Sequence, residues 1–387
     1  MWLDQPRNQN SPLAGLKVVE LARVLAGPWA GQILADLGAD VIKVESPEGD
    51  GTRLWGPPWV ERTDAGGTVH REAAYYHACN RGKRSIIADF REEADLVRVR
   101  DLCRDADVVI ENFKTGSLTK FGLDYASLSA PNPGLVYCSI TGFGQTGPRA
   151  HEAGYDFVIQ GMSGFMSVTG EPDGEPMKMG ISISDLTTGT WAANGIQAAL
   201  LQRERAGPFQ GRGQHLDMSL MDCSVALLAN QASYFLNTGK NPPRMGNAHA
   251  QVAPYGVFPV SDGHVILAPA NDGLFVKLAD LFGRQDWIDN PDFSSNAGRV
   301  ANAALLDAEI AAETSKRTKA DLLALCKEHG VPAGPINDLD EVFGDPQVIA
   351  RGLRVDLGGM PGVRSPFTFS HAELALDRPS PILGEDN

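Results

Sequence analysis

The chain has few of the residues from which disulfide-bonded and metal-binding proteins are built. Its 387 residues include only five cysteines and eight histidines. The cysteines stand far apart without a Cys-x-x-Cys pair, and no His-x-x-x-His or mixed Cys/His cluster occurs. This pattern excludes a disulfide scaffold and a zinc-type site, and it indicates free thiols in a reducing compartment. We therefore expect a cytoplasmic protein without a metal.

Other absences concern membranes and nucleic acids. No apolar run approaches the roughly 20 residues that cross a membrane, and residues 1–15 lack the apolar centre of an export signal. Basic residues are in deficit, because 34 Lys and Arg face 48 Asp and Glu, a net charge of −14. Such a chain has no general attraction for nucleic acids or anionic membranes, so a phosphorylated ligand would need a local group of cations. Neither a Walker phosphate loop nor a nucleophile-elbow serine occurs.

What the sequence does contain, over about residues 15–145, is a regular alternation of apolar strands and helices. Residues 17–21 and 41–44 read as buried strands that flank a helix beginning at Pro28, which requires a parallel pair. Further strand patterns follow at 85–88, 107–111 and 135–140. The expected class is α/β, with a large Rossmann-like open sheet.

The remainder of the chain predicts a second, smaller domain and a returning tail. Residues 186–236 read as largely helical and complete the first domain, 1–236. A hairpin signal at Ser261-Asp262-Gly263, followed by helical patterns, indicates a small α+β domain over 237–330. The loop-rich residues 331–387 are expected to pack back on the large domain, which would then be built from both chain ends.

Asp185 is distinguished by its surroundings. It follows a small-residue, apolar segment, 154–170, and precedes a long apolar helix pattern at 186–202. A carboxylate at the mouth of a dry pocket can act as a covalent nucleophile. An aspartate before a helix can equally cap the free N–H groups of the first turn. This segment alone leaves both interpretations open.

Three further segments have both a functional and an ordinary interpretation. The motif Gly142-Phe-Gly-Gln-Thr-Gly147 matches GxGxxG after a strand, but Pro148 follows where a dinucleotide fold needs a helix. The cations of 81–84 are either a solvated turn or a phosphate anchor, to which Arg53 and Lys120 could add. Residues 244–249 are either a mobile loop that covers a site or an ordinary surface loop.

Together these segments resemble the family III CoA-transferases, which include formyl-CoA:oxalate, carnitine and succinyl-CoA:dicarboxylate CoA-transferases and α-methylacyl-CoA racemases. The likeness is collinear over about residues 13–384 and is greatest to the succinyl-CoA:dicarboxylate, glutarate-type branch. The matching motifs include Leu25-Ala26-Gly27-Pro28, Leu37-Gly38-Ala-Asp-Val-Ile-Lys43-Val-Glu45, Gly82-Lys83-Arg84-Ser85-Ile86, Glu111-Asn112-Phe113, Gly142-Phe-Gly-Gln-Thr-Gly-Pro148, Gly154-Tyr155-Asp156 and Gly330-Val-Pro-Ala-Gly-Pro335.

The resemblance implies an interlocked homodimer that binds no permanent cofactor and uses coenzyme A and acyl-CoA as substrates. It places the family's nucleophile on Asp185. Ser46 and Lys120 depart from the pattern, because formyl-CoA transferase has arginines at both positions. The implied CoA-binding positions and nearby cations are Leu25, Ala26, Arg53, Lys83, Arg84, Ala88, Asp89, Phe90, Arg91, Asn112, Phe113, Lys114, Lys120 and Tyr155.

The expected reaction moves CoA from an acyl-CoA, by resemblance succinyl-CoA, to a free dicarboxylic acid through an aspartyl anhydride and an aspartyl-CoA thioester. The second carboxylate of such an acid needs a buried partner, and the candidates are Arg244, Gly246, Asn247 and His249. One alternative is the racemase activity, which needs two bases, although Tyr155 stands where racemases have a histidine. The other is a CoA-binding protein without catalysis.

Overall fold

The structure is a computed structural model that describes residues 2–64 and 66–387. The chain forms two compact units. The first contains residues 1–165, 178–239 and 347–387, and the second contains 166–177 and 240–346. As expected, the large unit is built from both chain ends, but residues 166–177 and 331–346 fall in the small unit, which differs from the predicted boundaries.

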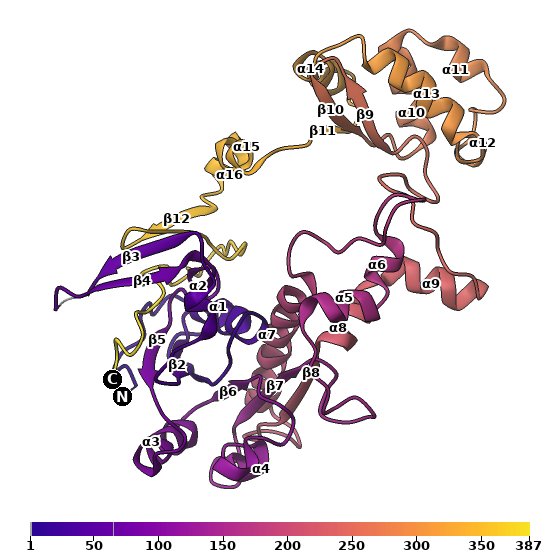
Figure 1. Cartoon of the computed structure of the whole chain (residues 1–387). Helices are drawn as coiled ribbons and strands as arrows, with labels where there is room; N and C mark the ends of the chain where they lie inside the picture. The colour runs from indigo at the N-terminus through magenta and orange to yellow at the C-terminus, as the bar shows by residue number, and fades with distance from the viewer. Residues whose placement is uncertain (1, 65) are drawn as a thin grey trace. The chain divides into compact units, whose positions relative to one another are not determined.

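A six-stranded, fully parallel sheet forms the centre of the first unit (Figure 1). Its spatial order is β5-β2-β1-β6-β7-β8, which is 3-2-1-4-5-6 when the six strands are numbered along the chain. This is the doubly wound order, and its direction reverses between β1 and β6. The strands are β1 (Lys17–Glu20), β2 (Asp40–Glu45), β5 (Arg84–Ile87), β6 (Val108–Glu111), β7 (Val136–Thr141) and β8 (His215–Ser219).

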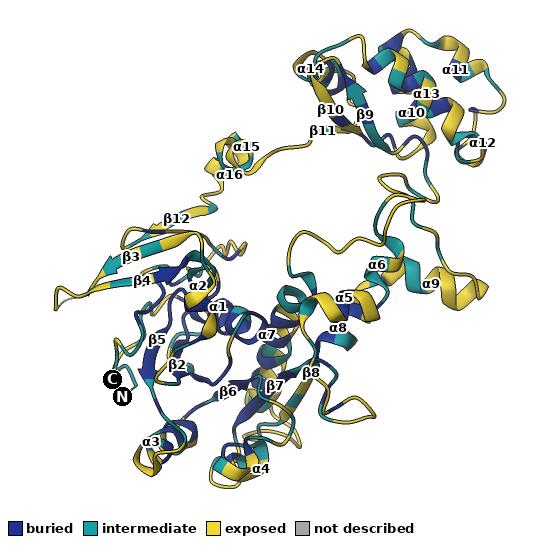
Figure 2. Ribbon diagram, viewed as in Figure 1, coloured by how far each residue is buried: buried dark blue, intermediate teal, exposed yellow. Residues whose placement is uncertain are grey.

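Five of these strands confirm the sequence prediction, and β8 corrects it. The five are short apolar runs with both faces covered, and they are almost completely buried in Figure 2. β8 lies within 186–236, which was expected to be largely helical. It is an edge strand in which exposed and half-buried residues alternate. Its sequence therefore lacks the continuous apolar content that identified the others.

Two hydrophobic cores cover the two faces of the sheet. Alternate strand residues such as Val18 and Val108 pack with α1 (Ala26–Asp36) and α7 (Ile183–Glu204). Their neighbours in sequence, which point the other way, pack with α3 (Glu93–Arg104) and the short helix α4 (Tyr125–Ser129). Side chains that alternate along a strand point to opposite faces, so one apolar run supplies both cores.

The C-terminal residues pack on the N-terminal part of the first unit, and shorter elements complete this unit. Backbone hydrogen bonds tie the C-terminal residues to the start of the chain, with Ala375 N donating to Asp36 O at 2.8 Å and Asp386 N donating to Ser85 O at 2.9 Å. The remaining elements are η1 (Gly51–Leu54), β3 (Trp59–Thr63), β4 (Val69–Ala73), α2 (Ala74–His77), η2 (Thr119–Phe121), α5 (Asp156–Met162), α8 (Leu220–Leu227), α9 (Ala229–Thr238), α16 (Pro346–Ala350), β12 (Arg354–Leu357) and β13 (Met360–Val363).

The second unit is a small antiparallel sheet with helices. Its strand order is β11-β10-β9, and the predicted hairpin at Ser261-Asp262-Gly263 joins β9 to β10. Fifteen buried side chains form its separate core. The elements are β9 (Gly256–Val260), β10 (Gly263–Leu267), β11 (Ala333–Pro335), α10 (Asp272–Phe282), α11 (Gln285–Asp289), α12 (Asn296–Ala301), α13 (Ala303–Thr314), α14 (Lys319–His329) and α15 (Leu339–Gly344), while α6 (Phe165–Val168) begins at the boundary.

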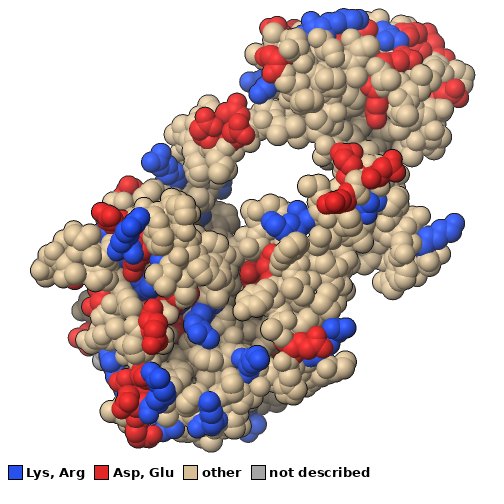
Figure 3. All heavy atoms as spheres, in the orientation of Figure 1, with Lys and Arg blue, Asp and Glu red and all other residues tan. Residues whose placement is uncertain are grey.

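Charged side chains of both signs lie on the surface (Figure 3). On the face drawn in Figure 3, Lys and Arg side chains are scattered among acidic and uncharged ones. Within residues 2–64 and 66–387, no helix has the length and apolarity that a membrane crossing requires.

Candidate active site

Asp185 lies in the first turn of α7 but does not cap it. The N-cap residue is Ser182, whose side chain makes no capping bond. The carboxylate of Asp156, at the start of α5, instead accepts hydrogen bonds from the N–H groups of Ser184 at 2.8 Å and Asp185 at 3.4 Å. The capping interpretation of Asp185 is therefore wrong, since Asp156 satisfies these free donors of the helix.

Asp185 lines a cavity of about 410 Å³ within the first unit. The cavity lies where loops leave the carboxyl ends of β1, β6 and β7, beside the point where the strand order reverses. Open α/β sheets bind ligands at this place. The lining residues are Arg23, Val24, Ala26, Gly51, Asn112, Phe113, Lys114, Thr115, Ile140, Thr141, Gly142, Ala150, Glu152, Ala153, Gly154, Tyr155, Asp185 and Leu220.

Glycines allow the backbone segments around the cavity to approach each other. A Cβ on Gly142 would lie 2.5 Å from the Cα of Gly154, so the turn after β7 crosses the segment before α5 at a distance that no side chain permits. A Cβ on Gly189 would lie 2.4 Å from Ala26 O, where α7 meets the start of α1. The GxGxxG-like segment thus serves close backbone packing here.

The environment of Asp185 favours its neutral form. Burial, followed by the neighbouring charge of Asp156, raises the pKa of the Asp185 carboxyl from its usual 3.8 to about 7. Among residues 2–64 and 66–387, none of the hydrogen bonds found ends on the Asp185 carboxylate. A partly buried carboxylate that accepts few hydrogen bonds is more reactive toward a carbonyl carbon than a fully hydrated one.

Several predicted CoA-binding residues gather around the same cavity. Ala26, Asn112, Phe113, Lys114 and Tyr155 line it together with Asp185. Six other predicted positions lie outside the lining. Leu25 is buried and precedes α1, the residues 88–91 follow β5, and Lys120 is on η2. The three predicted cations that remain are buried and are described below.

Aromatic contacts link the segment after β5 to the cavity wall. The ring of Phe90 stacks on that of Phe113, with centroids 6.3 Å apart, and meets Phe121 edge-on at 5.4 Å. Lys114 and Lys120 are exposed, as is Arg91, which forms an ion pair with Asp89 at 2.6 Å. The segments 88–91 and 112–121 therefore form one surface that carries exposed cations beside the cavity.

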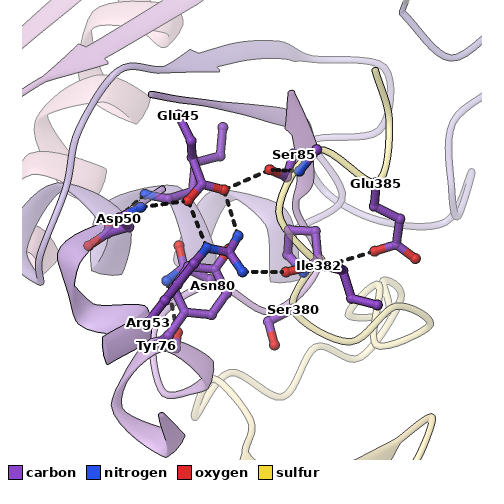
Figure 4. A network of polar contacts seen from close by, with 12 residues as sticks. Glu45, Asp50, Arg53, Tyr76, Asn80, Ser85, Ser380, Ile382 and Glu385 are labelled. Atoms are coloured by element: carbon purple, nitrogen blue, oxygen red, sulfur yellow. Dashed lines mark hydrogen bonds and ion pairs between the residues drawn. The ribbon is translucent and has the colours of Figure 1, made fainter. Parts of the chain in front are cut away.

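Three predicted cations are instead buried in ion pairs. Arg53 bonds to Glu45 at 2.6 Å and to the Tyr76 hydroxyl at 2.6 Å, within the network in Figure 4. It also pairs with Glu72. Lys83 is fully buried against Glu20, 2.7 Å away.

The third of these cations is Arg84, which pairs with Asp40 at 2.6 Å. Exposing any of the three to a phosphate would leave an unpaired carboxylate inside the protein, which is costly. Their burial argues against a direct role in CoA binding, and we leave them out of the site proposed below.

The candidate acceptor residues all belong to the second unit. Arg244 donates to the backbone oxygens of Glu171 at 3.2 Å and Gly174 at 2.6 Å. Gly246, in the same loop, has a left-handed backbone with φ of 57° and lies so near Glu171 that a Cβ would be 2.8 Å from its carboxylate. His249 Nδ1 accepts from Gln251 N at 3.1 Å. The loop that also carries Asn247 is therefore tied by Arg244 to residues 171–174.

Comparison with known proteins identifies the class. The family model described as CoA-transferase family III matches residues 13–387, and the chain belongs to this family. It is a CoA-transferase, and the resemblance found in the sequence is confirmed.

The relatives extend over the full chain. It is 55% identical over 388 residues to the succinate–glutarate CoA-transferase of Agrobacterium fabrum, covering 99% of this chain and 95% of the relative. It is 36% identical to the human succinyl-CoA:glutarate CoA-transferase over 394 residues, covering 100% and 87%. The crystal structure of a CAIB/BAIF family protein from Brucella suis matches with a TM-score of 0.88, 57% identity and 97% coverage of both chains.

The raised pKa of Asp185 predicts that Asp185→Asn stabilises the protein in a pH-dependent way. The folded-state pKa of about 7 lies above the usual 3.8. Between these values the native protein keeps a proton that the unfolded chain releases, so wild-type stability falls as the pH rises through this window. The amide does not titrate. The stability gain of the variant over the wild type should therefore grow from pH 4 to 7 and stay level above.

Urea unfolding of both proteins at pH 5, 6 and 8 measures this difference. Asp280→Asn, which changes an exposed aspartate on α10, controls for the loss of one negative charge. A stability gain for Asp185→Asn that is the same at pH 5 and pH 8 would contradict the burial argument.

Proposed function

We propose that this enzyme transfers CoA from succinyl-CoA to a glutarate-like dicarboxylic acid, with Asp185 as the covalent carrier. The observation that carries the proposal is the Asp185 carboxylate, poor in hydrogen bonds, in a cavity lined by five predicted CoA-binding residues. The names of the relatives support the choice of substrates, since both similar enzymes described above act on succinate or succinyl-CoA and on glutarate.

The chemistry proceeds in four acyl transfers. Asp185 Oδ attacks the thioester carbonyl, the C–S bond breaks, and CoA leaves as a thiolate while an acyl–aspartyl anhydride remains. The thiolate then attacks the Asp185 carbonyl and releases succinate, which gives an aspartyl-CoA thioester. The acceptor carboxylate attacks this thioester, the C–S bond breaks, and CoA leaves again as a thiolate while a second anhydride forms. The thiolate finally takes the new acyl group and regenerates the Asp185 carboxylate.

The residues around Asp185 suit this sequence in two ways. Partial burial keeps water from an anhydride, which would otherwise hydrolyse. Asp156, by accepting from Ser184 N and Asp185 N, holds the first turn of α7 and thereby the nucleophile. The charge of Asp156 also raises the pKa of Asp185. When Asp185 is acylated it loses its negative charge, which removes the repulsion between the two carboxylates.

The alternatives lack such support. A racemase needs two bases on opposite faces of the substrate carbon. The side chain of Tyr155 is a weak base at neutral pH, and the carboxylate of Asp156 is engaged with the first turn of α7. A protein that only binds CoA would have no use for a desolvated carboxylate in the cavity.

Asp185→Ala should abolish CoA transfer, with a loss of at least about 10⁴-fold, the scale seen when a nucleophile is removed. Free CoA should still bind, because the cavity wall remains. Asp185→Asn should lose activity similarly, since an amide cannot form the anhydride.

Hydroxylamine trapping tests the covalent step. Wild-type enzyme incubated with succinyl-CoA and then with hydroxylamine should carry its modification on the peptide that contains Asp185, read by mass spectrometry. Normal turnover by Asp185→Ala, or modification of a different residue, would refute the mechanism.

The acceptor preference should depend on the loop of the second unit that carries Arg244 and His249. A dicarboxylate leaves one carboxylate unreacted, and a charged hydrogen bond to it contributes about 1.5–3 kcal/mol. We expect kcat/KM for glutarate to exceed that for valerate by tenfold or more. Arg244→Ala or His249→Ala should reduce the glutarate-to-valerate ratio by a larger factor than it reduces the total rate of CoA transfer.

Arg212→Ala is the matched control, because it removes an exposed cation from the loop before β8. Equal kcat/KM for glutarate and valerate in the wild type would refute the dicarboxylate assignment. If the wild type prefers glutarate and both loop variants keep the same glutarate-to-valerate ratio, then neither Arg244 nor His249 binds the second carboxylate.

We also propose that the enzyme is a homodimer with interlocked chains. Apolar side chains on α5 and α9 are exposed within the chain, including Phe157 (58%), Phe235 (46%) and Leu236 (78%), and α9 is largely exposed in Figure 2. Apolar surface of this kind marks an interface. Sedimentation should give twice 41.4 kDa at all accessible dilutions, because interlocked chains cannot separate without unfolding. A folded species of 41.4 kDa would refute this.

A further inference from the structure

The loop that follows β1 is held by side chains rather than by regular secondary structure. Lys43 Nζ donates to Ala22 O at 2.8 Å. The amide of Asn112, at the end of β6, binds both sides of the next residue, accepting from Arg23 N at 2.8 Å and donating to Arg23 O at 2.6 Å. Two elements adjacent to β1 thus fix the loop where it enters the Asp185 cavity.

Val24 is the unusual residue of this loop. Its φ is +72°, a left-handed conformation that is rare for a β-branched side chain. Asp50 accepts from Val24 N at 3.2 Å, and the thiol of Cys79 lies 3.6 Å from Val24 O, so both sides of this residue are held. Such conformations persist only where surrounding contacts enforce them, and they gather at functional sites.

Asp50 is itself rigidly held. It is 1% exposed, and its carboxylate lies 3.0 Å from Lys43 Nζ. Thr52 adds hydrogen bonds from its N–H at 3.0 Å and its hydroxyl at 2.8 Å, and Figure 4 shows Asp50 N donating to Glu45. Burial opposes ionisation, but Lys43 and Thr52 outweigh it and lower the pKa of Asp50 to about 2. The acceptor for Val24 N is therefore a permanent anion.

We propose that Asp50 is a positioning residue for CoA, which holds Val24 in its left-handed conformation and so keeps residues 23–26 shaped for the Asp185 cavity. This inference rests on the CoA site proposed above. Val24 and Ala26 line the cavity, whereas Asp50 lies behind the loop and outside the lining. Asp50 therefore acts through the backbone of Val24 and does not need to touch the substrate.

The physical consequence is a population effect. Without the carboxylate, Val24 would relax toward negative φ, and only a minor fraction of molecules would keep the binding shape. The apparent dissociation constant rises by the inverse of that fraction. For strain of this kind the factor is about ten to a hundred. Glycine adopts positive φ without this penalty, so Val24→Gly should remove the need for Asp50.

The test is a double-mutant cycle of Asp50→Ala and Val24→Gly, read by calorimetric titration with free CoA. In the wild-type background Asp50→Ala should weaken CoA binding more than threefold, and about tenfold or more is expected. In the Val24→Gly background the same substitution should cost less than threefold. The KM for succinyl-CoA should rise in Asp50→Ala while the KM for glutarate stays within twofold.

Thr52→Val is the control, since it removes a hydroxyl from the same buried network without touching Val24. Should Asp50→Ala fail to show cooperative unfolding, Asp50→Asn, which keeps one oxygen but loses the charge facing Lys43, is put through the same cycle. A loss below threefold, or an equal loss in both backgrounds, would overturn the inference. Failure of the wild type to bind CoA would instead refute the proposed function.

Discussion

The buried pairing of Lys43 with Glu20 and Asp50 is the interaction on which the loops of the site depend. All three side chains are inaccessible to solvent, and Lys43 lies 3.1 Å from Glu20 and 3.0 Å from Asp50. Burial opposes the charge on Lys43, but Asp50, Glu20 and Glu45 outweigh it and hold its pKa above the usual value. Loss of one partner from such a group costs about 3–5 kcal/mol, because a charge is then left uncompensated. The group therefore fixes the carboxyl ends of β1 and β2, from which the loops leave.

Two aspartates in the first unit show how the fold separates structure from chemistry. Asp50 is surrounded by donors and a cation, and its pKa is lowered to about 2. Asp185 is half-buried, and burial together with the charge of Asp156 raises its pKa to about 7. The same functional group thus has its pKa shifted in opposite directions, which suits the anchoring role proposed for Asp50 and the reactive role proposed for Asp185. The difference comes from the partners that each side chain meets.

The sequence predicted the parts of the fold that apolar patterns encode directly. Continuous apolar runs identified five strands, and their parallel order follows from the intervening helices. β8 was not predicted, because the alternating polar and apolar residues of this edge strand do not form a continuous apolar run. The pairing of Asp156 with the first turn of α7 also escaped, because it joins residues 28 apart whose contact depends on the crossing at Gly142 and Gly154.

Charged residues were the least predictable part of the site. In an acidic chain, a group of cations suggests a phosphate-binding site, and three were predicted to be one: Arg53, Lys83 and Arg84. Each of them instead pairs with a carboxylate from a neighbouring strand or loop. Sequence distance conceals such pairs, since Lys83 and Glu20 are 63 residues apart. Whether a cation is buried depends on which distant residues the fold brings next to it. The burial of an apolar run can be predicted from the run's own sequence.

The division of residues between the two units has a consequence for specificity. The carboxylate proposed to carry the acyl group, and the residues proposed to bind CoA, belong to the first unit. The residues proposed to select the acceptor acid belong to the second, where Arg244 is fixed by the backbone of residues 171–174. The two sets share no side chain. If this proposal holds, a substitution in the loop of residues 244–251 changes which acid is accepted and leaves the pKa of Asp185 and the support of Val24 as they are. Such independence suits the transferases of this family, which share one transfer chemistry and differ in the acid they use.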